Sequence, residues 1–311
     1  MLVSIGIPTY QRLATLRRSL ASAQAQTYEP LEIVICDNAS QDGTEAFCAA
    51  AAAADPRVRY VRHARNLGPT ANFNELFRRC TGDYVLMLAD DDWLDPDYVA
   101  ACVRVLRADR GAALVAGRPQ FVRDGEPVAP GAWHHHCQDG LADRVLGYLS
   151  SVRDNGVFYG VVPRAVLQRA LPLPNALGND WLHIARIAAQ GSVQMIDEVE
   201  IHRELGGTSA DVATILSTFG RSGWQGRIPQ LVIAWEVLRD VGWRHPVYAE
   251  LGRTRRLVVG LRAAVVSIAW PDLAWHLVTP AVAALRRRPR GRFLWRAYDR
   301  ATRALGAGQS R

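Results

Sequence analysis

Three adjacent aspartates, Asp90, Asp91 and Asp92, have the clearest chemical potential in this 311-residue sequence. Neighbouring carboxylates repel one another, so a buried cluster needs compensating positive charge. Mg²⁺ and Mn²⁺ supply that charge, because they take oxygen ligands from one or two carboxylates together with substrate phosphates. The alternative is a solvated acidic turn before a helix. Because the cluster follows an apolar strand and precedes Trp93, a metal-binding role is the favoured interpretation.

Polar residues also follow the first two predicted strands. Pro8-Thr9-Tyr10 ends the first strand, and Asp37-Asn38 ends the second. A carboxylate or amide in this place can bind a base edge or ribose hydroxyls, and Tyr10 can stack on a base. The alternative for Asp37-Asn38 is an ordinary Asx turn. No Gly-rich fingerprint follows the first strand, which argues against a dinucleotide-binding dehydrogenase.

Asn179-Asp180-Trp181 begins a predicted helix. Asn and Asp are common helix caps, and capping is the structural interpretation of this motif. The functional interpretation makes Asp180 a general base that faces a pocket, with Trp181 as an apolar wall or a sugar-stacking face. These residues alone leave both interpretations open.

Histidines occur in two further places of interest. His134, His135 and His136 are consecutive and precede Cys137, whereas closed zinc sites use ligands spaced so that their side chains converge. A polar loop that lines an acceptor groove is therefore favoured over a zinc site. His202 lies at a strand end, where it can be a metal ligand, a phosphate donor or a structural histidine.

The elements that must position these residues alternate between strand and helix over the first 90 residues. Apolar, β-rich stretches predict strands at 2–8, 31–36, 58–61 and 84–88, and helical periodicity predicts helices at 13–25, from Asp42-Gly43 to Ala54, and at 70–79. Strands that alternate with helices of this length form a parallel sheet with helices on both faces. Ligands of such sheets bind beyond the carboxyl ends of the strands, where the polar clusters fall.

The pattern continues less regularly to about residue 210. It predicts a helix at 96–108, a strand at 112–116, a loop-rich stretch to about 138, a helix at 141–151, a strand at 157–162, a helix at 180–190 and a strand at 193–201. From about residue 211 the periodicity is helical only. We therefore expect an α/β domain over 1–210 and a helical, Arg-rich region over 211–311.

All 37 basic residues of the chain are Arg. The absence of Lys excludes Walker-type nucleotide loops, Schiff-base enzymes and nucleotidyltransferases with a catalytic lysine. The net charge of +7 is concentrated near the C-terminus: residues 1–250 carry 24 Arg against 28 acidic residues, and residues 251–311 carry 13 Arg against two. A basic tail of this kind favours anionic lipid or a partner protein over nucleic acid.

Residues 263–285 are largely apolar, but Pro271 and Pro280 divide them. Two packed or interfacial helices are therefore favoured over one membrane-spanning helix. The five arginines within 286–292 follow directly and favour a peripheral contact with a membrane; self-association or packing on the α/β domain is the alternative. Five cysteines without a C-x-x-C pair, and a short apolar N-terminus, predict a cytoplasmic protein in a reducing environment.

Taken together, these motifs resemble glycosyltransferase family 2, an inverting family with the GT-A fold. Residues 4–10 resemble its opening strand and residues 33–44 its second-strand signature. The stretch from Asn66-Leu67-Gly68 through Asn72 and Thr81-Gly82-Asp83-Tyr84 resembles its approach to the D-x-D motif at Asp90–Asp92. Asn179-Asp180-Trp181 resembles the later motif that bears the catalytic base. The resemblance covers about residues 1–210.

The resemblance implies a nucleoside-diphosphate-sugar donor of the UDP or dTDP type, and a saccharide or lipid-linked acceptor. It implies donor contacts from a set of strand-end residues: Pro8, Thr9, Tyr10, Asp37, Asn38, Asn66, Asn72, Asp90 and Asp91. It also implies Mn²⁺ or Mg²⁺ held by Asp92 and Asp90, with His202 as a further ligand.

The resemblance further implies that Asp180 takes the proton from an acceptor hydroxyl, which attacks the anomeric carbon and inverts it. Trp93 and Trp181 would contact the acceptor or the sugar. Gln11 stands where many members have Asn, and Asn38 replaces the second Asp of the commoner Asp-Asp pair. Leu205 stands where a late His is common, which leaves His202 and Arg203 as candidate phosphate contacts.

Two other functions compete with sugar transfer. A sugar nucleotidyltransferase of the same fold is disfavoured, because residues 9–12 contain no glycine where its Gly-rich loop would lie. A non-catalytic module that binds nucleotide sugars or polysaccharide is disfavoured, because both the acidic cluster and the candidate base are present.

Overall fold

The computed structural model of the chain describes residues 1–152, 154–205 and 228–268. All of these except Ile268 belong to one compact unit, Met1–Ser267. The expected domain boundary near residue 210 and the Arg-rich stretch 286–292 lie outside the described residues, so both stay predictions.

The first half of the sheet is parallel, as the sequence predicts. Its strands run in the order β3 (Val58–Arg62), β2 (Leu31–Asp37), β1 (Val3–Thr9) and β4 (Tyr84–Met87). The pairing of β1 with β2 continues without a bulge until Thr9 lies opposite Asp37. The carboxyl ends of these strands therefore meet at one edge of the sheet.

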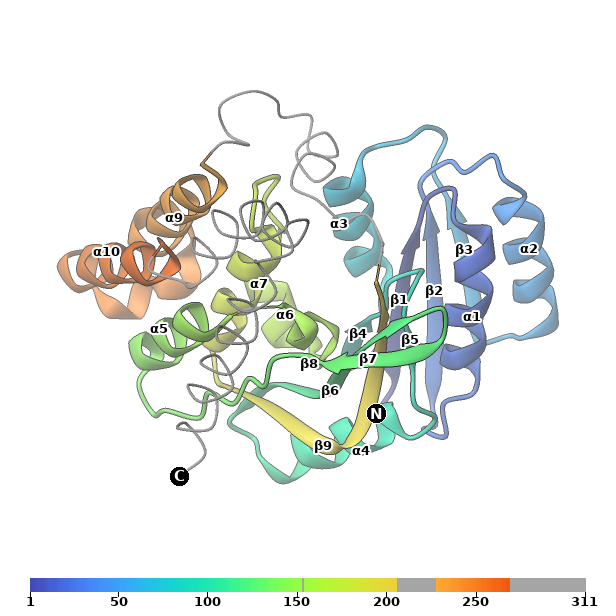
Figure 1. Cartoon of the computed structure of the whole chain (residues 1–311), viewed down its shortest axis with the longest axis horizontal. Helices are drawn as coiled ribbons and strands as arrows, with labels where there is room; N and C mark the ends of the chain where they lie inside the picture. Colours follow the sequence, from blue (N-terminus) through green and yellow to red (C-terminus); the bar gives the residue numbers. More distant parts are fainter. Residues whose placement is uncertain (153, 206–227, 269–311) are drawn as a thin grey trace, which may run out of the picture. The chain divides into compact units, whose positions relative to one another are not determined.

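Helices cover both faces of this half (Figure 1), as the predicted βαβ units require. They are α1 (Leu13–Gln24), α2 (Thr44–Ala54), α3 (Pro69–Arg79) and α4 (Tyr98–Ala108). Alternation along β2 explains the two layers: Ile33 and Ile35 share a buried cluster with Leu16 of α1, whereas Val34 packs in a second cluster with Leu76 of α3. A strand buried on both faces is apolar throughout, which is why it lacks a polar alternation.

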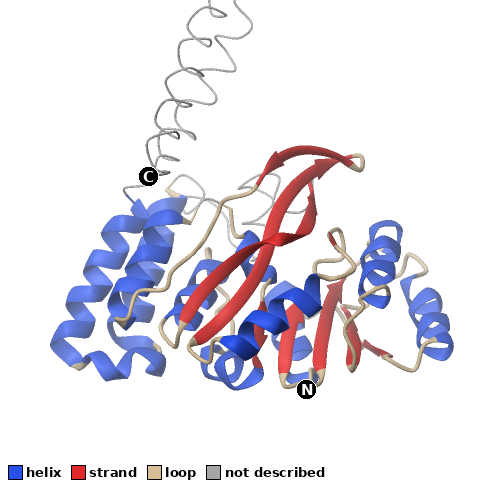
Figure 2. Cartoon of the chain, turned by 90° about the horizontal axis from the view of Figure 1, so that it is seen from below, coloured by secondary structure: helices blue, strands red, loops and turns tan. Residues whose placement is uncertain are grey.

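The second half of the sheet mixes strand directions. β8 (Val161–Pro163) is antiparallel to β4 and to β6 (Ala112–Arg123), β6 is parallel to β9 (Ser192–Glu204), and β9 is antiparallel to β5 (Trp93–Leu94). β6 and β9 are the long curved strands of Figure 2. Because β5 directly follows the acidic cluster and pairs with β9, the end of β9 lies beside this cluster.

The prediction of a loop-rich stretch between residues 116 and 138 is wrong for the first part of that stretch. β6 continues to Arg123 and turns into β7 (Glu126–Pro130). The turn consists of Asp124 and Gly125, both with positive φ (53° and 84°). Asp-Gly favours two-residue hairpin turns that need positive φ at both positions. This local signal outweighs the prolines that suggested a loop.

Two shorter segments also differ from expectation. The strand predicted at 157–162 is a 3₁₀ turn, η1 (Gly156–Tyr159), followed by the short strand β8. Gly160 joins them, and a Cβ there would lie 2.5 Å from the Leu114 side chain, so the backbone passes close to β6. After β8 comes α6 (Arg164–Ala170), which the sequence analysis does not predict.

A group of helices completes the compact unit (left half of Figure 1). It comprises α5 (Leu141–Ser151), α7 (Asn179–Ala188), α9 (Pro229–Arg239), the π-helical turn η3 (Asp240–Arg244), the 3₁₀ helix η4 (Pro246–Leu251) and α10 (Arg253–Ile268). Among the described residues, no helix combines the length and the apolar character that crossing a membrane would require.

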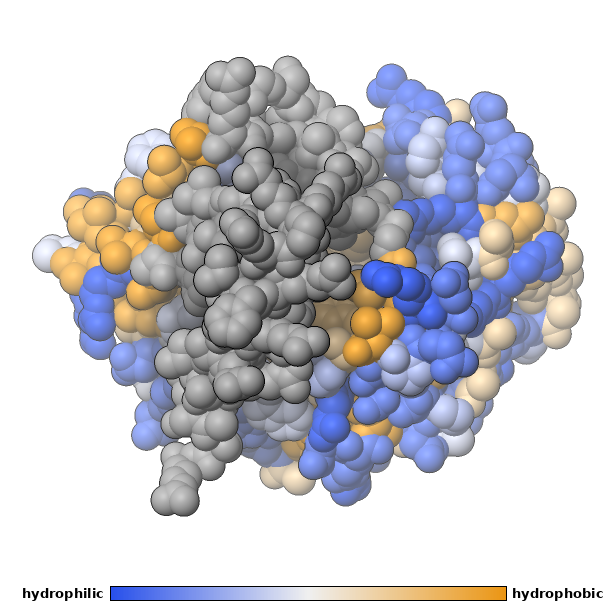
Figure 3. Space-filling model, in the orientation of Figure 1, coloured by the Kyte–Doolittle hydropathy of each residue, from blue (hydrophilic) through white to orange (hydrophobic). Residues whose placement is uncertain are grey.

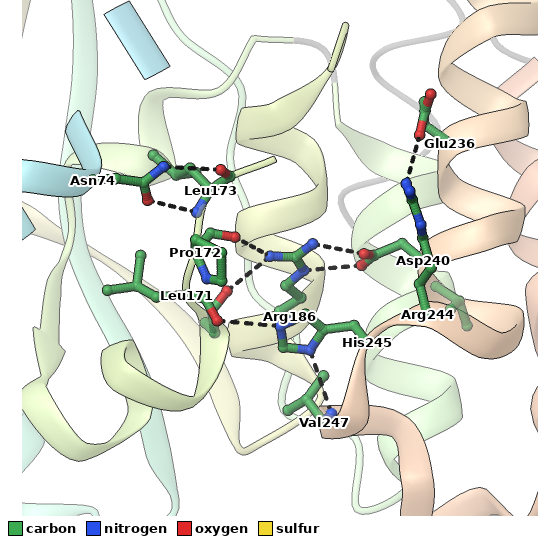
Figure 4. A network of polar contacts seen from close by, with 12 residues as sticks. Asn74, Leu171, Pro172, Leu173, Arg186, Glu236, Asp240, Arg244, His245 and Val247 are labelled. Carbon is green, nitrogen blue, oxygen red and sulfur yellow. Dashed lines mark hydrogen bonds and ion pairs between the residues drawn. The ribbon is translucent and has the colours of Figure 1, made fainter. Parts of the chain in front are cut away.

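One buried ion pair joins α7 to the C-terminal helices (Figure 4). The Arg186 guanidinium donates to both carboxylate oxygens of Asp240, at 3.0 and 2.6 Å, and both side chains are 5% exposed. Arg186 also donates to the carbonyls of Ala170 and Pro172. Bidentate charged hydrogen bonds are strong and directional, so this contact fixes the position of α7 against η3.

Breaking this pair should destabilise the fold strongly. Arg186→Met leaves the Asp240 carboxylate buried without its partner, which typically costs about 3–5 kcal/mol of unfolding free energy. The double variant Arg186→Met/Asp240→Leu should lose less than the sum of the two single variants, because it buries no unpaired charge. Urea unfolding of the four proteins measures this coupling. Additive losses would show that the pair contributes no interaction energy.

Candidate active site

The carboxyl ends of β1, β2 and β4 are tied together by polar contacts. Thr9 donates its hydroxyl to Asp90 at 2.8 Å, and the Asn38 amide donates to the Thr9 carbonyl at 2.9 Å. Pro8 and Thr9 are buried, whereas Tyr10 is 41% exposed and available to a ligand. The structure therefore brings together the first-strand, second-strand and aspartate residues that the sequence singled out.

Two arginines partly neutralise the acidic cluster. Arg12 lies 3.3 Å from Asp90 and 2.5 Å from Asp91, and the Arg203 guanidinium lies 3.8 Å from Asp92. The sequence gives no signal for this role of Arg12, apart from its place three residues after Thr9, the last residue of β1. Like charges this close need such compensation to stay buried.

Burial raises the pKa of two carboxyls in the acidic cluster. It raises the pKa of Asp90 to about 6 and that of Asp92 to about 7, and the negative charge of Asp91 adds to both shifts. Arg12 and Arg203 act in the opposite direction but do not cancel the effect of burial. The site can therefore accept further positive charge.

Asp37 is fully buried at the end of β2, where protein groups occupy both carboxylate oxygens. One oxygen accepts from the Ser40 amide at 2.9 Å, and the other accepts from the Tyr60 hydroxyl at 2.7 Å and lies 3.6 Å from Arg62. The bond from the Ser40 amide closes the turn after β2 three residues on, one residue beyond the Asx turn weighed from the sequence. Donor binding by Asp37 stays a prediction, and its visible role is to shape the turn.

Three asparagines connect this turn to the start of α3. Asn38 donates to Asn66 at 2.8 Å and accepts from the Leu67 amide at 2.8 Å. Asn72 donates to the Cys36 carbonyl and contacts the ring of His63. Asn38 and Asn72 are buried, whereas Asn66 is exposed at the surface. Asn38 and Asn66 thus form a hydrogen-bonded rim at the end of β2, and Asn72 is bonded to the end of that strand beside it.

Trp93 and His202 lie opposite one another on β5 and β9. Their rings stack at 5.1 Å, and the Arg18 guanidinium lies 3.6 Å from the Trp93 ring. Nε2 of His202 is 2.8 Å from a carboxylate oxygen of Asp95. Both side chains thus have protein partners, and their predicted roles toward metal, acceptor or sugar are not tested by this geometry.

Asp180 is the second residue of α7 and is partly buried. Gly178 precedes the helix with φ of 73°, a conformation that glycine adopts without strain. Burial raises the pKa of the Asp180 carboxyl, while Asn155, the Trp181 amide and Arg203 partly oppose the shift. Trp181 packs against the adjoining apolar core. A base with a raised pKa is better matched to proton transfer near neutral pH.

Arg203 lies beside the acidic cluster. Its Nε lies 3.8 Å from Asp92 and its Nη1 lies 3.7 Å from Asp154, and its positive charge slightly lowers the pKa of Asp180. Its Nε and Nη1 atoms are buried and have no hydrogen-bond acceptor among the described residues. Buried donors without acceptors are costly in a folded protein, so these atoms are suited to an anionic ligand.

The expected polar loop at His134–His136 is only partly correct. His134 and His136 are buried and pack against the Tyr148 ring at 5.8 and 6.1 Å, whereas His135 is exposed. A β-bridge between His136 and Val193 places alternate residues inside. Burial lowers the pKa of His136 to about 4, which keeps it neutral. The described residues contain no metal-binding group of three or more His, Cys, Asp or Glu.

This topology, with carboxylates at the strand ends, defines a GT-A glycosyltransferase fold. The mannosyltransferase PcManGT from Pyrobaculum calidifontis, solved with GDP-Man and Mn²⁺, matches with a TM-score of 0.55 and 19% identity over 94% of this chain and 82% of that one. S. aureus TarS 1–349 with UDP-GlcNAc matches with a TM-score of 0.53 and 14% identity, over 86% and 82% of the two chains.

The family model for glycosyl transferase family 2 matches residues 4–159, and the chain belongs to this family. Chondroitin synthase of Escherichia coli is 39% identical over 147 residues, which are 47% of this chain and 21% of that protein. The GalNAc(5)-diNAcBac-PP-undecaprenol beta-1,3-glucosyltransferase of Campylobacter jejuni is 28% identical over 124 residues, 40% of each chain. The matched part is therefore less than half the length of either relative.

The raised carboxyl pKa values predict a pH effect on stability. In the unfolded chain an Asp carboxyl titrates near pH 3.9, so the folded protein binds more protons between about pH 4 and pH 7. This contribution to the unfolding free energy is complete below pH 4 and is lost as the pH rises through about 7. In EDTA, Asp92→Asn should therefore be more stable than wild type at pH 8, with a difference that shrinks towards pH 5.5.

Thermal unfolding of both proteins across this pH range makes the comparison, and other titrating groups cancel in the difference. Asp197→Asn, at an exposed position of β9, is the control and should show no pH-dependent difference. If the difference in stability between Asp92→Asn and wild type stays constant from pH 5.5 to 8, the carboxyl of Asp92 does not have a pKa raised by burial.

Proposed function

We propose that this protein is an inverting glycosyltransferase that moves a sugar from a nucleoside diphosphate to an acceptor hydroxyl. The observation that carries the proposal is Arg203, whose Nε lies 3.8 Å from Asp92 and whose buried Nε and Nη1 make no hydrogen bond to the described residues. A diphosphate bound there would lie against the acidic cluster, and the same positive charge acts weakly on the carboxyl of Asp180. Membership of the family supports this chemistry.

The donor's nucleoside is assigned to the rim at the ends of β1 and β2. Exposed Tyr10 can stack on a base, and Asn66 presents polar groups at the surface of the rim. Thr9 and Asn38 hold this rim to the acidic cluster. UDP or dTDP is the proposed nucleotide; the TarS structure with UDP-GlcNAc shows that this fold accepts such a donor in another protein.

Asp92 and Asp90 fit a divalent cation. They are hard oxygen ligands whose charge is only partly balanced by arginine, and Mg²⁺ or Mn²⁺ needs no more than one or two carboxylates when phosphates complete its shell. A bound cation would stabilise negative charge on the leaving diphosphate. Arg203 would donate Nε–H and Nη1–H, which lie 3.8 Å from Asp92 and 3.7 Å from Asp154 without a hydrogen bond, to the same phosphates.

Asp180 is assigned the role of general base. Its carboxylate accepts the proton of the acceptor hydroxyl while the acceptor oxygen forms a bond to the anomeric carbon. The bond from that carbon to the diphosphate oxygen breaks, and its electron pair leaves with the nucleoside diphosphate. Attack from the face opposite the leaving group inverts the anomeric centre in one displacement.

The acceptor is proposed to be a saccharide or a lipid-linked saccharide at the cytoplasmic side of a membrane. All five cysteines are free and four are buried, which supports the reducing environment of that compartment. Release of UDP from UDP-sugars with pooled acceptors, with and without Mn²⁺, tests the activity. Donor binding without turnover under every condition would instead favour a non-catalytic binding module.

The metal assignment predicts dependence on Asp92. Asp92→Asn removes one ligand charge but keeps the oxygen that accepts from the Glu204 amide at 3.0 Å, so the fold should survive. We expect the thermal stabilisation by UDP with Mn²⁺ and the divalent-dependent turnover to be lost. Exposed Asp97→Asn is the matched control and should behave as wild type. Full wild-type turnover in excess EDTA would refute the assignment.

The base assignment predicts a selective loss in Asp180→Asn. Asn keeps the size of Asp and an oxygen that can accept from the Trp181 amide, but not its basicity, so transfer should fall by about 10²–10⁴-fold with donor binding close to wild type. Slow donor hydrolysis should persist. Asp143→Asn, in the first turn of α5, controls for loss of a carboxylate near a helix N-terminus. Transfer at the wild-type rate would place the base elsewhere, and lost stability together with lost donor binding would favour capping alone.

A further inference from the structure

The C-terminal helices expose an unusual number of large apolar side chains. Of the thirteen exposed large hydrophobics among the described residues, eight lie within residues 228–268: Ile228, Leu231, Trp235, Trp243, Leu257, Val258, Leu261 and Val265. Each is at least 40% exposed, and Val265 is 63% exposed. Apolar residues gathered in this way mark an interaction surface. We refer to these eight residues as the α9–α10 face.

Two groups within the α9–α10 face are neighbours in space. Leu257, Leu261 and Val265 are spaced by four and form one stripe along α10, opposite its buried side. The rings of Trp235 and Trp243 meet edge to face at 6.2 Å. A Cβ built on Gly242 would lie 3.9 Å from the Leu257 side chain, so the stripe adjoins η3. Figure 3 shows orange, apolar surface over α9 and α10 at its left edge.

The charges around this face are mostly positive. Arg244, Arg253, Arg255 and Arg262 are exposed, and the Arg239 guanidinium lies 5.9 Å from the Trp235 ring. Of the three acidic residues in 228–268, Glu236 and Asp240 are buried next to arginines, and Glu250 is exposed. An apolar surface with tryptophans and a basic surround complements the interface of an anionic bilayer.

We infer that the α9–α10 face docks on the surface of a membrane that contains anionic lipid. Trp235, Trp243 and the stripe on α10 enter the interface, and the exposed arginines bind the lipid headgroups. A second copy of the chain fits less well, because a symmetric contact would bring the same arginines of both copies together. The basic sequence that follows, with nine Arg against two Asp in residues 269–311, continues the same charge preference.

Docking at this face would place α9 between the membrane and the turn that precedes Asp180. A Cβ on Gly178 would lie 3.1 Å from Ile233, which is partly buried on the side of α9 away from the exposed Leu231 and Trp235. An acceptor anchored in lipid would then reach the site by extending past this helix. This link to catalysis rests on the proposed function, whereas the docking itself does not require any sugar transfer.

Sedimentation of the 311-residue chain with vesicles tests the inference without an activity readout. The vesicles are phosphatidylcholine alone, or phosphatidylcholine with phosphatidylglycerol, at low and high salt. We expect binding to the anionic vesicles that weakens with salt. Trp235→Ser/Trp243→Ser should reduce it about tenfold or more, because two large apolar side chains no longer enter the interface. Trp133→Ser, 49% exposed outside this face, is the matched control.

Substitution of arginines measures the contribution of charge to vesicle binding separately from that of the apolar side chains. Arg255→Gln/Arg262→Gln should lower binding to anionic vesicles about 30-fold at low salt, the product of two arginine contributions. Unchanged vesicle binding by the tryptophan variant would overturn the inference. That result is also expected if residues 286–292 alone bind the lipid. Equal binding to both vesicle types, or a dimer that only the tryptophan variant abolishes, would overturn it as well.

Discussion

The burial of Asp90 and Asp92 at the end of β4 is the constraint on which the rest of the site depends. Charged carboxylates are stable in such a place only beside positive charge and hydrogen-bond donors. Thr9 and Arg12 on one side, and Arg203 on the other, supply part of this compensation. Their positions explain why the ends of β1 and β9 converge on β4, and why a cation and a diphosphate would complete the balance.

Arg203 is the residue through which the second half of the sheet contributes to the site. It lies near the end of β9, a strand that pairs with β6 along its length and with β5 beside the acidic cluster. From there its charge has a small effect on the pKa of Asp180 at the start of α7. The other end of α7 is fixed by Arg186 and Asp240, and α9 packs on the turn before it. The helix that carries the candidate base is thus held in place by the C-terminal helices.

Much of this could be predicted from the sequence, because the first 90 residues follow strict strand and helix periods. The strand ends at Thr9, Asp37 and Asp90 are predictable because parallel strands place their carboxyl ends together. The hairpin at Asp124-Gly125 is harder to predict because nearby prolines suggest a loop. The buried partners of Asp37 and the role of Arg12 could not be predicted, since they depend on side-chain contacts across segments up to 79 residues apart. The packing of His134 depends likewise on tertiary contacts that no local pattern encodes.

The central claim is that the β4 carboxylates and Asp180 act on the two ends of one donor molecule. A crystal structure with UDP and Mn²⁺, with anomalous diffraction to locate the manganese, tests it most directly. The account predicts an anomalous peak bound to Asp92 or Asp90 and to the diphosphate, with Arg203 on the phosphates and Asp180 facing the open end of the donor site. Well-ordered UDP at another place, or manganese away from both carboxylates, would contradict it.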